Sequence, residues 1–212
     1  MHFEERIPIF LDLGFRQEAI SELRLYLDLL WQSNEDLNLI SRKMSFEDLI
    51  DNHVIDCLLA LKAFASEISL ENKPVVGDFG SGGGLPGVLY AIQFPQVHFH
   101  LFEKSNRKQD FLRRCRASLA NNVTVHAEIP NKLPEMDLIM ARGFKPLDVI
   151  LDMSRGFYRA GGKLFLLKAR AEKIQEELAL ARKKFPDLKV RIEPLASPVL
   201  QVERHVVVVQ RA

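Results

Sequence analysis

A glycine-rich segment that follows a short apolar run constrains this 212-residue chain more than any other feature. Residues 74–79 have the composition of a buried strand, and residues 80–87 contain five glycines. Glycine adopts a positive φ readily, and a ligand can approach its backbone without meeting a Cβ atom. Loops of this kind follow the first strand of open α/β sheets, at the edge where ligands bind. The segment therefore predicts an α/β fold with a binding site at this turn.

Beyond residue 73 the chain alternates between strand and helix patterns. Short apolar runs predict strands, and apolar residues at three- and four-residue spacing predict helices. The predicted strands are residues 74–79, 97–102, 123–126, 137–141, 163–168, 188–193 and 204–210, and the predicted helices are residues 85–94, 106–119, 146–155 and 171–185. This order predicts a doubly wound, mostly parallel sheet of seven strands. Because no helix separates the last two strands, we expect a hairpin with an antiparallel last strand.

Residues 1–72 have a different character and predict a helical extension. Apolar side chains between residues 17 and 32 share one helix face, and the polar run at residues 33–36 is expected to end that helix. Ser45 and Asp48 have the spacing of a capping box, and an apolar stripe follows through residue 61. That stripe needs a surface to bury it. We therefore expect a main domain at residues 73–212 with the extension, residues 1–72, docked on it.

The charges are divided unevenly between these two parts. Residues 1–72 hold 6 Lys and Arg against 14 Asp and Glu, whereas residues 73–212 hold 23 against 14. A basic domain suits an anionic partner such as RNA. Two packed parts of opposite charge would give the same count, so both interpretations stay open.

The composition also excludes several classes of protein. No apolar run approaches the roughly 20 residues that cross a bilayer, and the first ten residues do not resemble a signal peptide. Two cysteines, Cys57 and Cys115, cannot build a framework of several disulfides or a zinc ribbon. We therefore expect a cytoplasmic protein without membrane association and without a metal.

The glycine segment fits two cofactor patterns. Gly82, Gly84 and Gly87 satisfy the G-x-G-x-x-G pattern of dinucleotide-binding proteins, which is weak evidence on its own. Read from Asp78, with Gly80 as its first glycine, the same segment satisfies the D-x-G-x-G-x-G pattern of enzymes that use S-adenosylmethionine (SAM). A glycine loop that serves packing only is the third interpretation.

Three features favour SAM over a dinucleotide. Asp78 places an acid near the loop, where it would help to hold the ammonium group of SAM but would repel a phosphate. Pro86 begins a helix close to the ligand. The final hairpin replaces the strand–helix–strand continuation that is more usual in a dinucleotide fold.

Further candidate residues stand where later strands end. Glu103 is positioned to accept from both ribose hydroxyls of either cofactor. Ala127 and Glu128 would offer a backbone N–H group and an acceptor to an adenine ring, and Arg142 would grip a phosphate or the methionine carboxylate. The alternatives are a helix-capping role for Glu103, a solvated Glu128, and an ion pair of Arg142 with Asp78 or Glu128.

Several motifs together resemble the 16S ribosomal RNA guanine-N7 methyltransferase family RsmG, also called GidB. The matching segments are N-L-I-S (residues 38–41), H-V-I-D-C-L (53–58), D-F-G-S-G-G-G-L-P-G (78–87), E-K-S-N-R-K (103–108) with F-L (111–112), A-R (141–142), and G-G-K (161–163) with L-K (167–168). They span about residues 36–170, and the combination is far more specific than any one motif.

The resemblance implies a Rossmann-like class I methyltransferase fold and SAM as the methyl donor. The implied substrate is 16S rRNA, or the small ribosomal subunit, with methylation at N7 of guanine 527 in the 530 loop. Cofactor contacts carried over by position fall on the following residues: Gly80, Leu85, Ala127, Glu128 and Arg142. The chain departs from the family pattern at four positions: Glu103 replaces Asp, His126 replaces Arg, Gly143 replaces Ala, and Ala169 replaces Gly.

The implied reaction places few chemical demands on the protein. Guanine N7 carries a free lone pair and no proton, so it can attack the sulfonium methyl directly without a general base. We therefore expect no catalytic base, and the protein's task is to hold N7 in line with the methyl group. Asn38 and His53 are candidates for lining the guanine pocket, and a core role is the alternative for His53.

Basic helix faces are candidates for phosphate contacts, with ordinary solvated surfaces as the alternative. They comprise Arg107, Lys108, Arg113, Arg114 and Arg116 on one helix, and Arg182, Lys183 and Lys184 on another. RNA as the substrate depends mainly on the resemblance. The alternative functions are a SAM enzyme for a small molecule or protein, an NAD(P)-dependent oxidoreductase, and a regulator that binds SAM without catalysis. We expect the protein to act as a monomer.

Overall fold

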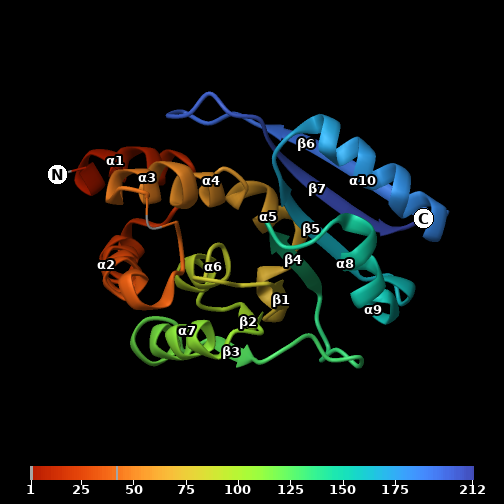
Figure 1. Ribbon diagram of the computed structural model, residues 1–212, viewed down its shortest axis with the longest axis horizontal. Coiled ribbons are helices and arrows are strands. Elements are labelled where there is room, and N and C mark those ends of the chain that lie inside the picture. Colours follow the sequence, from red (N-terminus) through yellow and green to blue (C-terminus); the bar gives the residue numbers. More distant parts are fainter. Residues whose placement is uncertain (1, 42) are drawn as a thin grey trace.

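The computed structural model describes residues 2–41 and 43–212, and within them seven strands form one sheet in the order β3-β2-β1-β4-β5-β7-β6 (Figure 1). The strands are β1 (Val75–Phe79), β2 (His98–Phe102), β3 (Val123–His126), β4 (Leu138–Arg142), β5 (Lys163–Lys168), β6 (Leu188–Leu195) and β7 (Arg204–Arg211). β1 to β5 run parallel, and β7 is antiparallel to both β5 and β6. The predicted seven-stranded sheet with an antiparallel last strand is confirmed.

Helices cover both faces of the sheet. They are α1 (His2–Asp12), α2 (Ile20–Leu37), α3 (Phe46–Leu49), α4 (Ile55–Leu58), α5 (Leu61–Glu67), α6 (Gly87–Gln93), α7 (Asn106–Ser118), α8 (Leu147–Met153), α9 (Arg155–Arg159) and α10 (Ala171–Lys184), with short 3-10 or π turns at η1 (Gln17–Ala19), η2 (Ile50–Val54) and η3 (Leu70–Asn72). The alternation along β4 divides the core, because Leu138 and Met140 pack with α1–α7 whereas Ile139 and Ala141 pack with α8–α10.

The end of α2 differs from the sequence-based expectation. The polar run at residues 33–36 was expected to end this helix, but the helix continues to Leu37. Ser33 and Asn34 are buried, and the Asn34 Oδ1 atom accepts from the Ile40 N–H group at 2.8 Å. Tertiary packing therefore outweighs the local polar signal, and the helix ends instead at Asn38, which has a φ of 50°.

The next helical stretch begins as predicted and then deviates. Ser45 and Asp48 form the capping box, with the Asp48 N–H group donating to the Ser45 hydroxyl at 3.0 Å. The stretch then passes through the π turn η2, so the helix predicted through residue 61 is resolved into α3, η2 and α4, and a turn at residues 59–60 precedes α5.

The extension packs directly on the sheet domain. The Tyr26 hydroxyl donates to the Gly83 carbonyl, and the Tyr90 hydroxyl donates to the Cys57 carbonyl, both at 2.7 Å and both buried. Phe64 of α5 contacts aromatic rings from three elements of the main domain: Tyr90, Phe94, Phe99 and Phe165. Figure 1 shows α1–α5 along one side, with the β6–β7 hairpin reaching toward them.

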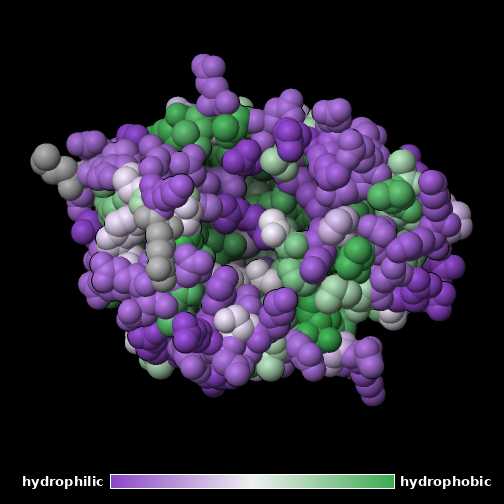
Figure 2. Space-filling view, viewed as in Figure 1, coloured by the Kyte–Doolittle hydropathy of each residue, from purple (hydrophilic) through white to green (hydrophobic). Residues whose placement is uncertain are grey.

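Part of the uneven charge is matched within the molecule. Glu67 of α5 accepts from Lys163 at 2.8 Å and also pairs with Arg191. Asp56 of α4 likewise pairs with Arg142 and Arg204 of the main domain. Figure 2 shows hydrophilic side chains over much of the visible face and a hollow near its centre. The intramolecular interpretation thus accounts for part of the uneven charge.

Within the described part of the chain, no helix is long and apolar enough to span a membrane. The two cysteines are buried and are not linked to each other. Burial raises the pKa of both thiols to about 12, so they stay protonated at neutral pH.

Replacing Phe64 tests the docking of the extension. We expect Phe64→Ala to lower the free energy of unfolding by about 3–5 kcal/mol, because it leaves a cavity among four aromatic rings. Urea denaturation followed by circular dichroism measures this change. The matched control is Leu25→Ala, which removes an exposed apolar side chain of the same extension and should change stability by less than about 0.5 kcal/mol. Equal stabilities of both variants would show that the extension is not packed as described.

Candidate functional site

The loop after β1 has the backbone conformation that its glycines allow. Gly80, Gly82 and Gly84 have φ values of 77°, 57° and 89°. The N–H groups of Gly80 and Ser81 donate to the Phe102 carbonyl at 2.9 and 3.1 Å, which fixes the loop against the end of β2. These positive φ values strain any residue with a Cβ atom.

The three glycines differ in what surrounds them. A Cβ atom on Gly80 would overlap the ring of Phe144, and one on Gly84 would overlap Val88. A Cβ atom on Gly82 would meet only the Gly80 carbonyl oxygen, at 3.8 Å, so this position borders open space. Gly80 and Gly84 are therefore required for packing, whereas the space beside Gly82 is open.

Glu103, which follows β2, contacts the glycine loop. Its Oε2 atom accepts from the Gly82 N–H group at 3.0 Å, and its Oε1 atom accepts from the Ser105 N–H group at 2.8 Å. The parallel pairing of Phe79 with Phe102 brings the two strand ends together. The carboxylate is thus oriented toward the loop, with remaining lone pairs for a second donor on each oxygen.

The other predicted cofactor residues lie near the same edge. β3 ends at His126, whose carbonyl accepts from the Glu103 N–H group at 3.1 Å, and the exposed Ala127 and Glu128 follow directly. Leu85 is half-buried and packs against the core on the extension side. The loop, the end of β2 and the residues after β3 therefore lie side by side at the carboxyl ends of these strands.

Asp78 lies below the loop rather than in the open volume. Its side chain is buried, with 1% of the residue exposed, and no described residue forms a hydrogen bond with its Oδ2 atom. A Cβ atom on Gly87 would collide with this oxygen, which explains the glycine at the start of α6. Burial raises the pKa of Asp78 to about 7.

Arg142 ends β4 and is held by the extension. Its Nε atom donates to Asp56 Oδ2 at 3.0 Å, and its Nη2 atom donates to His53 Nδ1 at 2.6 Å. The sequence leaves open an ion pair of Arg142 with Asp78 or Glu128, but in the structure the carboxylate that pairs with Arg142 is Asp56 of α4. Burial and the neighbouring guanidinium lower the pKa of His53 to about 4, so its ring is neutral and Nδ1 is an acceptor at neutral pH.

Asn38 is separate from this group. It is exposed at the end of α2, and it precedes Leu39, whose side chain and carbonyl lie against Gly83 of the loop. The structure therefore brings His53 and Arg142 together, whereas Asn38 lies beside the loop.

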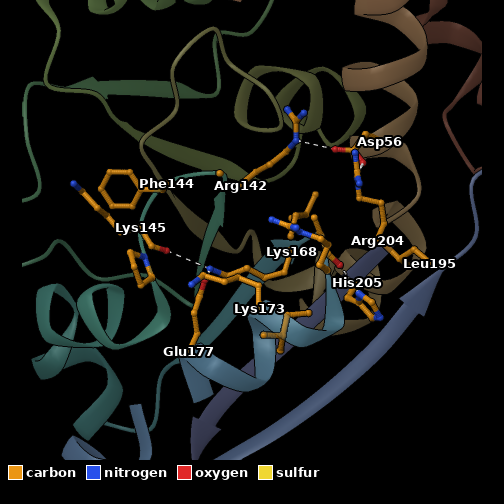
Figure 3. Close-up of a pocket in the computed structure, with 16 residues that line it drawn as sticks. Asp56, Arg142, Phe144, Lys145, Lys168, Lys173, Glu177, Leu195, Arg204 and His205 are labelled. Atoms are coloured by element: carbon orange, nitrogen blue, oxygen red, sulfur yellow. Dashed lines mark hydrogen bonds and ion pairs between the residues drawn. The ribbon is translucent and has the colours of Figure 1, made fainter. Parts of the chain in front are cut away.

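A cavity of about 450 Å³ opens next to Arg142, at the carboxyl ends of β4 and β5 (Figure 3). Its lining includes charged residues from five elements or their flanking loops: Asp56, Arg142, Lys145, Lys168, Arg170, Lys173, Glu177 and Arg204. Phe144 lines the cavity and also packs on Gly80, so its ring contacts both the cavity and the glycine loop.

Sequence reasoning missed Phe144, Lys168 and Arg204 at this cavity. Lys168 pairs with Glu177 at 2.7 Å, and Arg204 pairs with Asp56. A topological signal was present for Arg204, because an antiparallel strand beside β5 must begin where β5 ends. Among the described residues, no three His, Cys, Asp or Glu side chains are placed to hold a metal ion.

The fold has relatives among solved structures. The plantazolicin methyltransferase BpumL, solved in complex with S-adenosylhomocysteine (SAH), matches with a TM-score of 0.56 over 92% of this chain and 99% of that one, at 13% identity. A likeness at this identity shows the shared fold, which is the class I methyltransferase arrangement that the family resemblance implies.

Sequence relatives are closer. Ribosomal RNA small subunit methyltransferase G 1 of Bdellovibrio bacteriovorus is 62% identical over 208 residues, which cover 98% of each chain. The enzyme of Pelagibacter ubique named ribosomal RNA small subunit methyltransferase G is 31% identical over 80% of this chain and 81% of its own length. The model of the family GidB, described as rRNA small subunit methyltransferase G, matches residues 19–207. The chain therefore belongs to the GidB family.

Proposed function

We propose that this protein transfers a methyl group from SAM to N7 of guanine 527 in the 530 loop of 16S rRNA. The observation that carries the proposal is the family match over residues 19–207, together with relatives named for small-subunit rRNA methylation. The open volume beside Gly82 supports it, because a family enzyme needs a cofactor site at this loop. Since the proposed substrate is bacterial ribosomal RNA, the expected compartment is the cytoplasm.

The residues around the loop suit SAM. Glu103 would accept from the ribose hydroxyls, and Ala127 and Glu128 would meet the adenine ring beyond β3. Gly80, Gly82, Gly84 and Leu85 would form the wall against which the nucleoside lies. When bound, SAM supplies a methyl group on a positively charged sulfur. Asp78, buried below the loop, would add negative charge near the ligand's ammonium group.

The cavity beyond Phe144 suits the incoming guanine. Phe144, which lines the cavity, also packs on Gly80 of the glycine loop, and Arg142 is another lining residue. N7 has a lone pair without a proton, so the chain has only to orient the base and exclude water. His53 is neutral and hydrogen-bonded to Arg142, so it adds no positive charge where the guanine ring becomes cationic. His53 and Arg142 are thus proposed substrate neighbours, and Asn38 is proposed to contact RNA beside the loop.

The substrate is tested by methyl transfer in vitro. The purified protein, with tritiated SAM, should label 16S rRNA or small subunits from a strain whose own methyltransferase G gene is deleted. Mass spectrometry of nuclease fragments should place the label on one guanine of the 530 loop. Label at another nucleotide would contradict the position, and label only on a small molecule or protein would contradict the substrate. Binding of NAD in place of SAH, measured by calorimetry, would contradict the cofactor.

Gly82→Val tests the cofactor wall. The added side chain enters the open volume, and we expect SAH affinity to fall by up to about 100-fold, because steric overlap costs about 1–3 kcal/mol. Gly161→Val is the matched control, since Gly161 also has a positive φ, 89°, and open space around it, but lies before β5. Both variants carry similar backbone strain, so calorimetry separates ligand space from strain. Equal affinities in the two variants would show that Gly82 does not border the ligand.

The pH dependence of SAH binding tests Asp78. Its pKa of about 7 leaves the carboxyl largely neutral at pH 6 and ionised at pH 8. If the ionised form favours the ligand's ammonium group, affinity should rise by about tenfold over this range, because the competent fraction rises by that factor. Asp78→Asn should bind more weakly and without this pH dependence. Calorimetry at pH 6, 7 and 8 measures both, and parallel profiles would exclude the role.

A further inference from the structure

One carboxylate in the cavity wall is shared by two arginines that lie far apart in the sequence. Asp56 Oδ2 accepts from Arg142 Nε at 3.0 Å, and Asp56 Oδ1 accepts from Arg204 Nε. The Asp56 side chain is only 9% exposed. Figure 3 shows both guanidinium groups converging on Asp56 from different elements, β4 and the start of β7.

The bond pattern of Arg204 leaves donors available. Nε is used by Asp56, and Nη1 donates to the Glu203 carbonyl at 2.8 Å. Nη2 has no partner among the described residues, and the residue lines the cavity. A planar guanidinium with free N–H groups matches the oxygens of a phosphate, and its orientation is already fixed through Nε.

The charge of the cavity selects an anion. Six lysines and arginines line it, against two acids, Asp56 and Glu177. Glu177 neutralises the charge of Lys168, whose Nζ atom lies 2.7 Å from Glu177 Oε2. The single negative charge of Asp56 offsets the charge of only one of the two arginines that it contacts. The lining therefore keeps a positive excess within a concave site of about 450 Å³, a size that suits a nucleotide.

The anion is not the methionine carboxylate of the cofactor. No residue of the glycine loop lines the cavity, and Phe144 is the lining residue that packs on this loop. Arg204 enters from the β7 side of the cavity, the side away from β1 in the strand order. A ligand that reaches Arg204 therefore arrives with the substrate.

We propose that Arg204 binds a phosphodiester group next to the target guanine, and that Asp56 is the residue that positions Arg204 and Arg142 together. This rests on the proposed function, because it takes the substrate to be RNA. In this arrangement the phosphate fixes the RNA backbone at the carboxyl end of β5, while the base lies toward Phe144 and the methyl donor. No covalent step involves either residue.

The first test compares substitutions of Arg204. Arg204→Gln should raise the KM for the rRNA substrate by about 10- to 100-fold, the worth of a charge-assisted hydrogen bond, and should leave SAH affinity unchanged. The slope of log affinity for RNA against log salt concentration should become shallower by about 0.7–0.9. Arg204→Lys keeps the positive charge, so its salt slope should equal that of the wild type. Its KM should lie between those of the wild type and Arg204→Gln. The matched control is Arg159→Gln, an exposed arginine of α9 near Arg211, at the opposite end of β7 from Arg204, which should change none of these.

The second test uses Asp56→Asn, whose effect distinguishes positioning from simple attraction. The substitution adds one positive charge to the cavity, so attraction alone predicts tighter RNA binding and a lower KM. Positioning predicts a higher KM, because the two guanidinium groups lose their common anchor. Circular dichroism melting establishes the temperature range in which the variant is folded. If Asp56→Asn does not fold, Asp56→Glu, which keeps the charge but moves the carboxylate, replaces it in the same measurement.

The outcomes separate the two proposals. If the wild-type protein transfers no methyl group to rRNA or subunits, the proposed function fails. If the wild type is active but Arg204→Gln keeps its KM and salt slope, or loses SAH affinity, the phosphate assignment is overturned. A lower KM for Asp56→Asn overturns the positioning role.

Discussion

The buried contacts between the helical extension and the main domain hold both parts of the site in place. Tyr26 of α2 donates to the carbonyl of Gly83 inside the glycine loop, and Asp56 of α4 accepts from arginines at the ends of two strands. Buried polar groups need such partners, since an unmet carbonyl or guanidinium costs several times what its hydrogen bond contributes. Contacts from residues 2–41 and 43–72 therefore hold residues of the proposed site in place, although the cofactor pattern lies outside this extension.

Much of the fold could be predicted from the sequence because its signals are local. β3 and β5 have the predicted bounds, since each apolar run is bordered by polar or glycine residues. The position of Glu103 also follows from local information, because parallel strands must end at one edge and Glu103 is the first residue after β2. The family resemblance required only motifs of this kind, and the comparisons confirm it.

The rest depends on contacts between distant residues, which no local pattern contains. The partner of Arg142 is Asp56, 86 positions earlier, and only the docking of α4 brings them together. The length of α2 depends on the burial of Asn34, which the polar composition of its neighbourhood conceals. The cavity itself is formed by the start of β7 meeting the end of β5, so its cationic lining emerges only from the complete sheet.

The place of β7 in the strand order has a consequence for how the enzyme is made. It is the last strand along the chain, yet it lies inside the sheet, between β5 and β6. The chain leaves the ribosome from its N-terminus, so the edge of β5 that pairs with β7 stays open until residues 204–211 have emerged. Arg204 can meet Asp56 only then, so the cavity is complete only after the whole sheet has been synthesised.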